Sequence, residues 1–162
     1  MGMSTGGMLL LHMSTSQPAR IRSMVLISTT TNFPDQARAI MRRASYDTLP
    51  PEVKEMYREC AKRGESQIRE LIAQFNAFYD DQDDMNFSSQ TLSSITTRTF
   101  IVHGDRDNFF PLDIAENMRD SIPNSTLWVI ANGEHVPIYD AVDDFTSKAL
   151  AFLEGPTANR KN

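Results

Sequence analysis

The chain has 162 residues, 40% of them hydrophobic and 23% charged, which is typical of one soluble globular domain with a buried core. Its formal net charge is −5, and acidic residues surround the basic residues that cluster in the sequence. We therefore expect no nucleic acid partner. Cys60 is the only cysteine, which excludes an internal disulfide and a cysteine-based zinc site.

The start of the chain predicts neither an export signal nor a membrane segment. The apolar run at residues 8–11 is far too short to span a bilayer, and no positively charged segment precedes it as in a signal peptide. Together with the single cysteine, this favours a reducing, cytoplasmic compartment.

Short apolar runs alternate with helical patterns along most of the chain. Three runs have the length of buried parallel strands, and prolines stand at the ends of several helical segments. The predicted strands are residues 24–27, 100–102 and 127–130. The predicted helices are one that starts at residues 8–13 and ends before Pro18, one at residues 113–122 and one at residues 141–153, the last with Val142, Phe145, Ala149, Phe152 and Leu153 on its inner side.

The middle of the chain, residues 29–97, contains helical patterns and no convincing strand. Pro50-Pro51 marks a helix start, and apolar residues between Ile68 and Tyr79 recur at helical spacing. We interpret this segment as a helical cap inserted into one domain of residues 1–154, followed by a loose C-terminal tail at residues 155–162.

Strands that alternate with helices predict an α/β fold, with about three parallel strands, right-handed crossovers and flanking helices. A sheet this small leaves the edge of its first strand uncovered. We therefore expect only part of a larger α/β fold.

A candidate nucleophile lies in the segment Gly2-Met3-Ser4-Thr5-Gly6, which matches the pattern G-x-S-x-G. In this pattern the serine sits on a sharp turn between a strand and a helix, so its hydroxyl projects outward. The flanking glycines relieve crowding, and the helix N-terminus favours developing negative charge. On its own the pattern also fits an ordinary glycine-rich turn.

Two further polar residues follow predicted strands: Asp107, with Asp105 as an alternative acid, and His135. Either would alone be read as a turn or surface residue. The order Ser4, Asp107, His135 along the chain, each after a strand, is however that of a nucleophile, an acid and a base at one edge of a parallel sheet.

In these motifs the chain resembles the α/β-hydrolase superfamily, and within it the serine-nucleophile esterases, lipases and carbon–carbon bond hydrolases. The resemblance runs from the turn at residues 2–7 through the strand at residues 20–27 and the acid loop at residues 100–107 to the segment Gly133-Glu134-His135. A serine in the turn separates the chain from dehalogenase relatives, which use aspartate there.

The resemblance implies a catalytic triad. Ser4 would be the nucleophile, His135 the general base, and Asp107 rather than Asp105 the acid that orients the histidine. The amide of Thr5 would be one donor of the oxyanion hole.

It also implies a small acyl or ester-type substrate and neither a metal nor an organic cofactor. Phe109 and Phe110, just after the acid, are the aromatic residues best placed to contact that substrate. His12 and His103 resemble structural positions.

Only Met1 precedes Gly2, whereas the resemblance implies a strand before the serine and an earlier loop with a second oxyanion donor. We therefore expect the C-terminal portion of a longer enzyme, with an open sheet edge, poor solubility and the N-terminal half of the fold as a possible partner. Two alternatives stay open: an acyltransferase with the same triad, and an inactive remnant or interaction module that needs the N-terminal half in trans.

Overall fold

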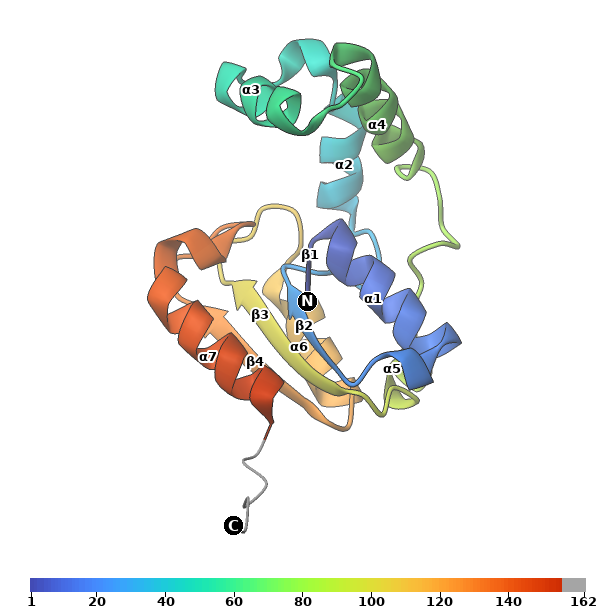
Figure 1. Ribbon diagram of the computed structural model, residues 1–162. Helices are drawn as coiled ribbons and strands as arrows, with labels where there is room; N and C mark the ends of the chain where they lie inside the picture. The colour runs from blue at the N-terminus through green and yellow to red at the C-terminus, as the bar shows by residue number, and fades with distance from the viewer. Residues whose placement is uncertain (156–162) are drawn as a thin grey trace. The chain divides into compact units, whose positions relative to one another are not determined.

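The computed structural model describes residues 1–155, so the predicted tail at 155–162 lies outside the described residues except for Gly155. The chain divides into two compact units (Figure 1). Met1–Asn32 and the chain from Met85 onward form the first unit, and Phe33–Asp84 forms the second. The second unit lies within the segment 29–97 that the sequence predicts to be a cap and is shorter than that segment at both ends.

A parallel sheet of four strands, in the order β1, β2, β3, β4, organises the first unit. Three of them, β2 (Ser23–Ile27), β3 (Arg98–Gly104) and β4 (Ser125–Ile130), are the strands predicted from the sequence. The fourth, β1 (Gly2–Met3), pairs with Leu26 and Ile27 of β2. The expectation of a parallel sheet of about three strands is confirmed, and β1 is an additional strand that the sequence did not predict, because two residues are too short to give a periodic signal.

Helices cover both faces of this sheet. They are α1 (Thr5–Ser16), α5 (Ser89–Ser93), α6 (Leu112–Ser121) and α7 (Val142–Glu154), with short turns of 3₁₀ helix at η1 (Pro18–Arg20) and η3 (Pro137–Ala141). The helices predicted at residues 8–13, 113–122 and 141–153 are confirmed as α1, α6 and α7. Because the strands lie in chain order, right-handed crossovers put α1, α5 and α6 on one face, and α7 covers the other (Figure 1).

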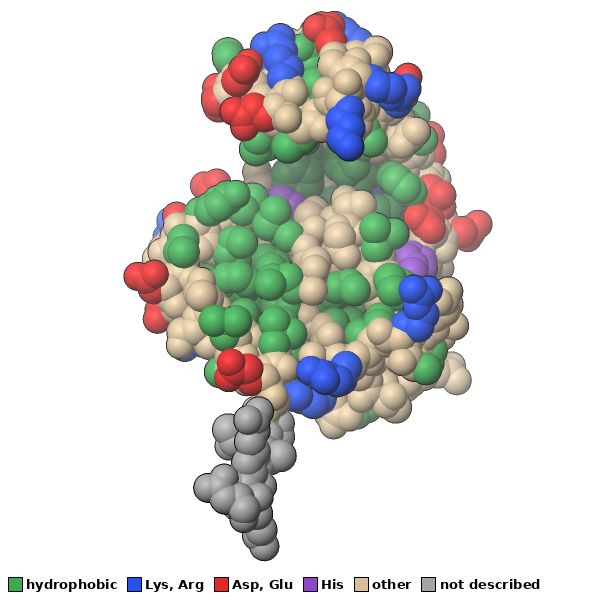
Figure 2. All heavy atoms as spheres, in the orientation of Figure 1, with side chains coloured by type: hydrophobic (Ala, Val, Ile, Leu, Met, Phe, Trp, Pro, Cys, Tyr) green, Lys and Arg blue, Asp and Glu red, His purple; other side chains and the backbone are tan. Residues whose placement is uncertain are grey.

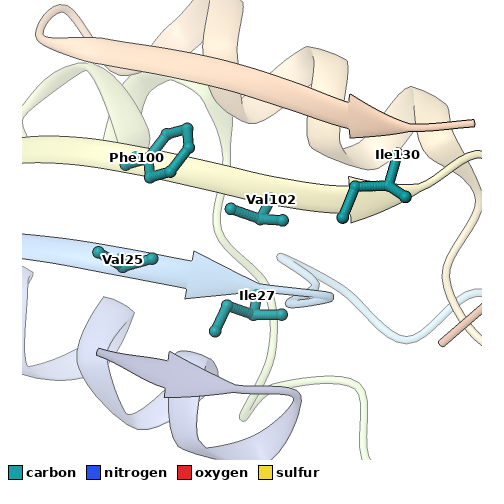
Figure 3. Packing of buried hydrophobic residues seen from close by; sticks show 5 residues of the cluster. All are labelled: Val25, Ile27, Phe100, Val102 and Ile130. Atoms are coloured by element: carbon teal, nitrogen blue, oxygen red, sulfur yellow. The ribbon is translucent and has the colours of Figure 1, made fainter. Parts of the chain in front are cut away.

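The core beneath α7 comes from alternate positions of neighbouring strands. Val25 and Ile27 on β2, Phe100 and Val102 on β3, and Ile130 on β4 form one buried cluster (Figure 3). Alternate residues of a strand point to the same face, so the apolar runs supply one side of the core from each strand.

The inner side of α7 is largely as predicted. Phe145, Phe152 and Leu153 pack against the cluster, and Ala149 is buried. Val142 is 54% exposed, so its predicted inward position was wrong. Val142 is the first residue of α7, where helical periodicity gives the least control over orientation.

The second unit is helical, as its sequence pattern predicts. It contains α2 (Asp35–Arg43), η2 (Tyr46–Thr48), α3 (Pro51–Cys60) and α4 (Glu65–Ala77). Within it, the guanidinium of Arg38 on α2 donates to the carbonyls of Phe78 and Tyr79 after α4. The apolar stripe of α4 is only partly internal, since Ile68 is 2% exposed and Leu71 is 53% exposed.

Candidate active site

Ser4 lies on a sharp turn between β1 and α1. Its φ of 49° is left-handed, which is rare for a residue other than glycine, and it forms the N-cap of α1. The amide of Ser4 donates a hydrogen bond of 2.8 Å to the carbonyl of Ile27, while its own carbonyl accepts one of 2.9 Å from the amide of Gly7. The turn is therefore tied to the sheet on one side and to the helix on the other.

The glycines of this turn are not equally constrained. A Cβ on Gly2 would overlap the backbone of Gly6, and a Cβ on Gly7 would overlap the side chain of Thr29. A Cβ on Gly6 would meet nothing within 4 Å. The expectation that both flanking glycines relieve crowding is confirmed for Gly2 and wrong for Gly6, because the second crowded position is Gly7.

We expect Gly2→Ala to destabilise the protein and Gly6→Ala to leave its stability close to that of the unchanged chain. The methyl group added at position 2 has no room against the backbone of Gly6, and overpacking of this kind typically lowers the free energy of unfolding by about 1–3 kcal/mol. Thermal unfolding followed by circular dichroism compares the variants. Equal melting temperatures for the two would contradict this reading of the turn.

The loop after β3 holds a buried carboxylate. Asp107 Oδ1 accepts hydrogen bonds from the amides of Phe109 (2.7 Å) and Phe110 (3.0 Å), and Oδ2 lies 2.9 Å from His135 Nδ1. Burial raises the pKa of Asp107, but the hydrogen bonds from His135 and from the two amides outweigh it and hold the pKa below its usual value. The alternative acid, Asp105, has an exposed side chain.

His135 lies between Asp107 and Ser4. Its Nδ1 is 2.9 Å from Asp107 Oδ2 and its Nε2 is 3.1 Å from Ser4 Oγ. An ionised carboxylate can only accept a hydrogen bond, so Nδ1 carries the proton and Nε2 accepts from the hydroxyl of Ser4. The structure thus brings together the three residues selected from the sequence, although Ser4 and His135 are 131 positions apart.

The loops that carry Asp107 and His135 come into close backbone contact at Gly104 and Gly133. The amide of Arg106 donates a hydrogen bond of 2.8 Å to the carbonyl of Gly133. A Cβ on Gly104 would overlap that same carbonyl. We expect this close approach of two backbones to fix the spacing between the carboxylate and the imidazole.

Two phenylalanines pack on the imidazole of His135. The ring centroids of Phe109 and His135 are 4.6 Å apart, and those of Phe110 and His135 are 5.3 Å apart. Phe110 is buried, with 2% of its surface exposed, and Phe109 is half-buried. Both rings restrict the rotation of the imidazole. Substrate contact stays a prediction for both, and Phe109 is the better placed of the two.

Thr5 is the first residue of α1 and directly follows Ser4. Amides in the first turn of a helix have no carbonyl partner within that helix and lie at the positive end of its dipole. The amide of Thr5 therefore lies next to Ser4 at this end of the helix, and its role as an oxyanion donor stays a prediction.

Of the two other histidines, His12 is half-buried and His103 is fully buried. His12 on α1 packs edge to face on Phe87, with 4.9 Å between the ring centroids. His103 on β3 is fully buried, and its Nε2 lies 2.9 Å from the carbonyl oxygen of Phe110. Burial lowers the pKa of His103 and keeps the ring neutral, so its distance of 3.8 Å from Asp107 Oδ2 does not make an ion pair.

We expect the free energy of unfolding to fall as the pH drops below about 6.5, the ordinary pKa of histidine. In the unfolded chain His103 takes up a proton near that pH, whereas burial holds its pKa lower in the folded protein. The unfolded state then binds more protons, so stability is lost by up to about 1.4 kcal/mol per pH unit until the folded-state pKa is reached. Denaturant unfolding between about pH 5 and pH 7.5 measures this slope. His103→Gln should reduce it, and an identical slope in both proteins would contradict the assignment.

The described part of the chain holds neither a cluster of metal-ligating side chains nor a membrane-spanning helix. Within residues 1–155, no three or more His, Cys, Asp or Glu side chains gather so that they could hold a metal ion. None of the helices described here is long and apolar enough to cross a membrane.

Solved structures of enzymes resemble this fold. CumD, a meta-cleavage product hydrolase from Pseudomonas fluorescens IP01, matches with a TM-score of 0.67 and 16% identity over 94% of this chain and 63% of its own. MGS-M2, an α/β hydrolase enzyme from a Medee basin deep-sea metagenome library, matches with a TM-score of 0.71 and 16% identity over 99% and 66%. BphD, the 2-hydroxy-6-oxo-6-phenylhexa-2,4-dienoate hydrolase of Rhodococcus sp. strain RHA1, matches with a TM-score of 0.66 and 17% identity over 92% and 62%.

At these identities the likeness establishes the fold alone, and the chain spans less than two thirds of the length of each matched structure. No curated protein sequence matches the chain. Residues 49–142, more than half of the sequence, match the family described as alpha/beta hydrolase fold, and this segment includes the loops of Asp107 and His135. The match and the parallel sheet with its flanking helices show that the chain belongs to the α/β-hydrolase family.

Proposed function

We propose that this chain carries the active site of a serine hydrolase that cleaves an ester, a thioester or a related acyl or carbon–carbon bond in a small molecule. The observation behind the proposal is the line of hydrogen bonds from Asp107 through His135 to Ser4, with distances of 2.9 and 3.1 Å. In such an arrangement the histidine can remove the proton from the serine hydroxyl while the serine oxygen attacks a carbonyl carbon.

In the first half of the reaction, Ser4 Oγ attacks the carbonyl carbon and His135 Nε2 takes the hydroxyl proton. Asp107 stabilises the imidazolium that forms, and the amide of Thr5 donates to the oxyanion. His135 then gives its proton to the leaving group, and an acyl group stays on Ser4. In the second half, His135 removes a proton from water, which attacks the acyl carbon, and the proton returns to Ser4 as the acid leaves.

The fold and the side chains beside the three residues support a proposal for the substrate class. Two of the matched structures are named for hydrolysis of small molecules, as a meta-cleavage product hydrolase and a phenylhexadienoate hydrolase. The half-buried ring of Phe109, which packs on His135, offers an apolar surface beside the imidazole. We infer a substrate with an apolar acyl or aromatic portion.

A fluorophosphonate probe tests the proposal without knowledge of the substrate, because it reacts with activated serines. We expect the 162-residue chain to be labelled and Ser4→Ala not to be labelled. The matched control is Ser16→Ala, at the exposed end of the same helix, where the hydroxyl only caps the carbonyl of His12. Absence of labelling in the folded, unchanged chain would mean that the triad does not work in this chain alone.

Acyl transfer to a small acceptor uses the same triad, with the acceptor in place of water. Product analysis separates the two reactions: hydrolysis releases the free acid, whereas transfer releases an acyl ester or amide of the acceptor.

A second candidate function is that of an interaction module, and the edge of the sheet favours it. Among the described strands, β1 has a neighbour only on the side of β2. Met1, Met3 and Leu9 around this edge are 67%, 39% and 61% exposed, and Figure 2 shows hydrophobic side chains gathered on the face that carries α7. The partner proposed for this edge is an N-terminal half of the same fold, supplied in trans.

Size-exclusion chromatography of the purified chain tests this second candidate. An exposed apolar edge should cause self-association or poor solubility. Elution as a stable monomer over a wide range of protein concentration would argue that the edge needs no partner.

A further inference from the structure

A buried histidine supports the turn that carries the carboxylate of the triad. His103, at the end of β3, has 0% of its surface exposed, and its Nε2 lies 2.9 Å from the carbonyl oxygen of Phe110. A carbonyl can only accept a hydrogen bond, so Nε2 carries the proton. Nδ1 has no hydrogen-bond partner in the described part of the chain, which fits a neutral ring with its lone pair on that atom.

Phe110 connects this histidine to the acid through its backbone. Its carbonyl accepts from His103, and its amide donates to Asp107 Oδ1 at 3.0 Å. The other carboxylate oxygen, Oδ2, bonds to His135. His103 Nε2 is 3.8 Å from Oδ2, too far for a hydrogen bond, so its influence on the carboxylate passes through the backbone of the turn.

We propose that His103 is a positioning residue, which holds the carbonyl of Phe110 and thereby keeps Asp107 Oδ2 aimed at His135 Nδ1. The inference rests on the proposed function, since the orientation of the Asp107 carboxylate affects the rate of reaction at Ser4 only if the triad transfers a proton. Without the imidazole donor, the carbonyl of Phe110 would be buried and unpaired, and the turn would shift to satisfy it. A shift of about 1 Å in a catalytic group lowers a rate by about 100-fold.

Two substitutions distinguish the effect of the His103 hydrogen bond from the effect of the volume of its ring. His103→Gln retains an N–H donor on the side chain, whereas His103→Phe fills a similar volume without a donor. We expect His103→Phe to lower the rate of fluorophosphonate labelling by about 10- to 100-fold and His103→Gln to stay close to the unchanged chain. If both variants kept the unchanged rate, the proposal would be overturned.

A second readout does not depend on activity. The Nδ1 proton of His135 gives a strongly deshielded NMR signal while it is hydrogen bonded to Asp107, at the observed 2.9 Å. His103→Phe should weaken or shift this signal, and His103→Gln should preserve it. A signal unchanged in folded His103→Phe would also overturn the proposal.

A measurement on the unchanged chain keeps the proposal testable even where His103→Phe does not fold. The nitrogen NMR shifts of the His103 ring should show a neutral imidazole protonated at Nε2. A proton on Nδ1 would overturn the proposal, because Nε2 then has nothing to donate to Phe110.

The two proposals fail in different ways. If the unchanged chain is not labelled but His103→Phe loses the His135 signal, the proposed function fails and the positioning role stands. If the unchanged chain is labelled and His103→Phe keeps both the rate and the signal, the positioning role fails and the function stands.

Discussion

Asp107→Asn is expected to lower the rate of fluorophosphonate labelling at Ser4 by about 1,000- to 10,000-fold while the chain stays folded. The asparagine occupies the same space, and its carbonyl oxygen still accepts from the turn amides. Its NH₂ group, however, donates to His135 Nδ1 and favours the tautomer with the proton on Nε2. That nitrogen lies 3.1 Å from Ser4 Oγ and can then no longer take the hydroxyl proton.

Asp105→Asn is the matched control for this prediction. It makes the same chemical change two positions earlier in the same loop, at a side chain that is exposed rather than buried. Its labelling rate should equal that of the unchanged chain, with both variants folded by circular dichroism. Equal rates for Asp107→Asn and Asp105→Asn would exclude Asp107 as the acid of the triad.

Gly104→Ala is expected to reduce both stability and the labelling rate. The new methyl group would overlap the carbonyls of Gly133 and Glu134, which belong to the loop of His135. Both carbonyls directly precede His135 in the chain, so we expect their displacement to shift the imidazole. We expect the free energy of unfolding to fall by about 2–3 kcal/mol, the melting temperature to fall by about 4–12 °C, and labelling to slow by about 100-fold.

Differential scanning calorimetry and the labelling rate measure the two effects of Gly104→Ala. Gly6→Ala serves as the control, because the same methyl group there meets nothing within 4 Å. A Gly104→Ala protein with unchanged labelling would show that the backbone contact between the two loops does not set the position of His135. Destabilisation without slower labelling would assign Gly104 a purely structural role.

The sequence by itself predicted the elements whose patterns are local. The apolar runs of β2, β3 and β4 and the helical spacing of α1, α6 and α7 repeat over several residues, and the structure confirms all six. The selection of Ser4, Asp107 and His135 also needed only sequence: their order after three strands places them at one edge of a parallel sheet, and the resemblance to the α/β-hydrolase superfamily favoured Asp107 over Asp105. Their mutual distances agree with that selection, while their roles remain proposals.

Tertiary structure decided the features that depend on contacts between distant positions. β1 exists only because two residues pair with β2, and Gly7 rather than Gly6 is crowded only because Thr29 lies against it. The placement of His103 behind the turn at Phe110 likewise has no periodic signal. Apolar runs and helical spacing determined where the main strands and helices lie in the sequence. Steric fit and hydrogen-bond pairing between segments leave no local pattern, and they decided how the turn, the loops and the supporting histidine fit together.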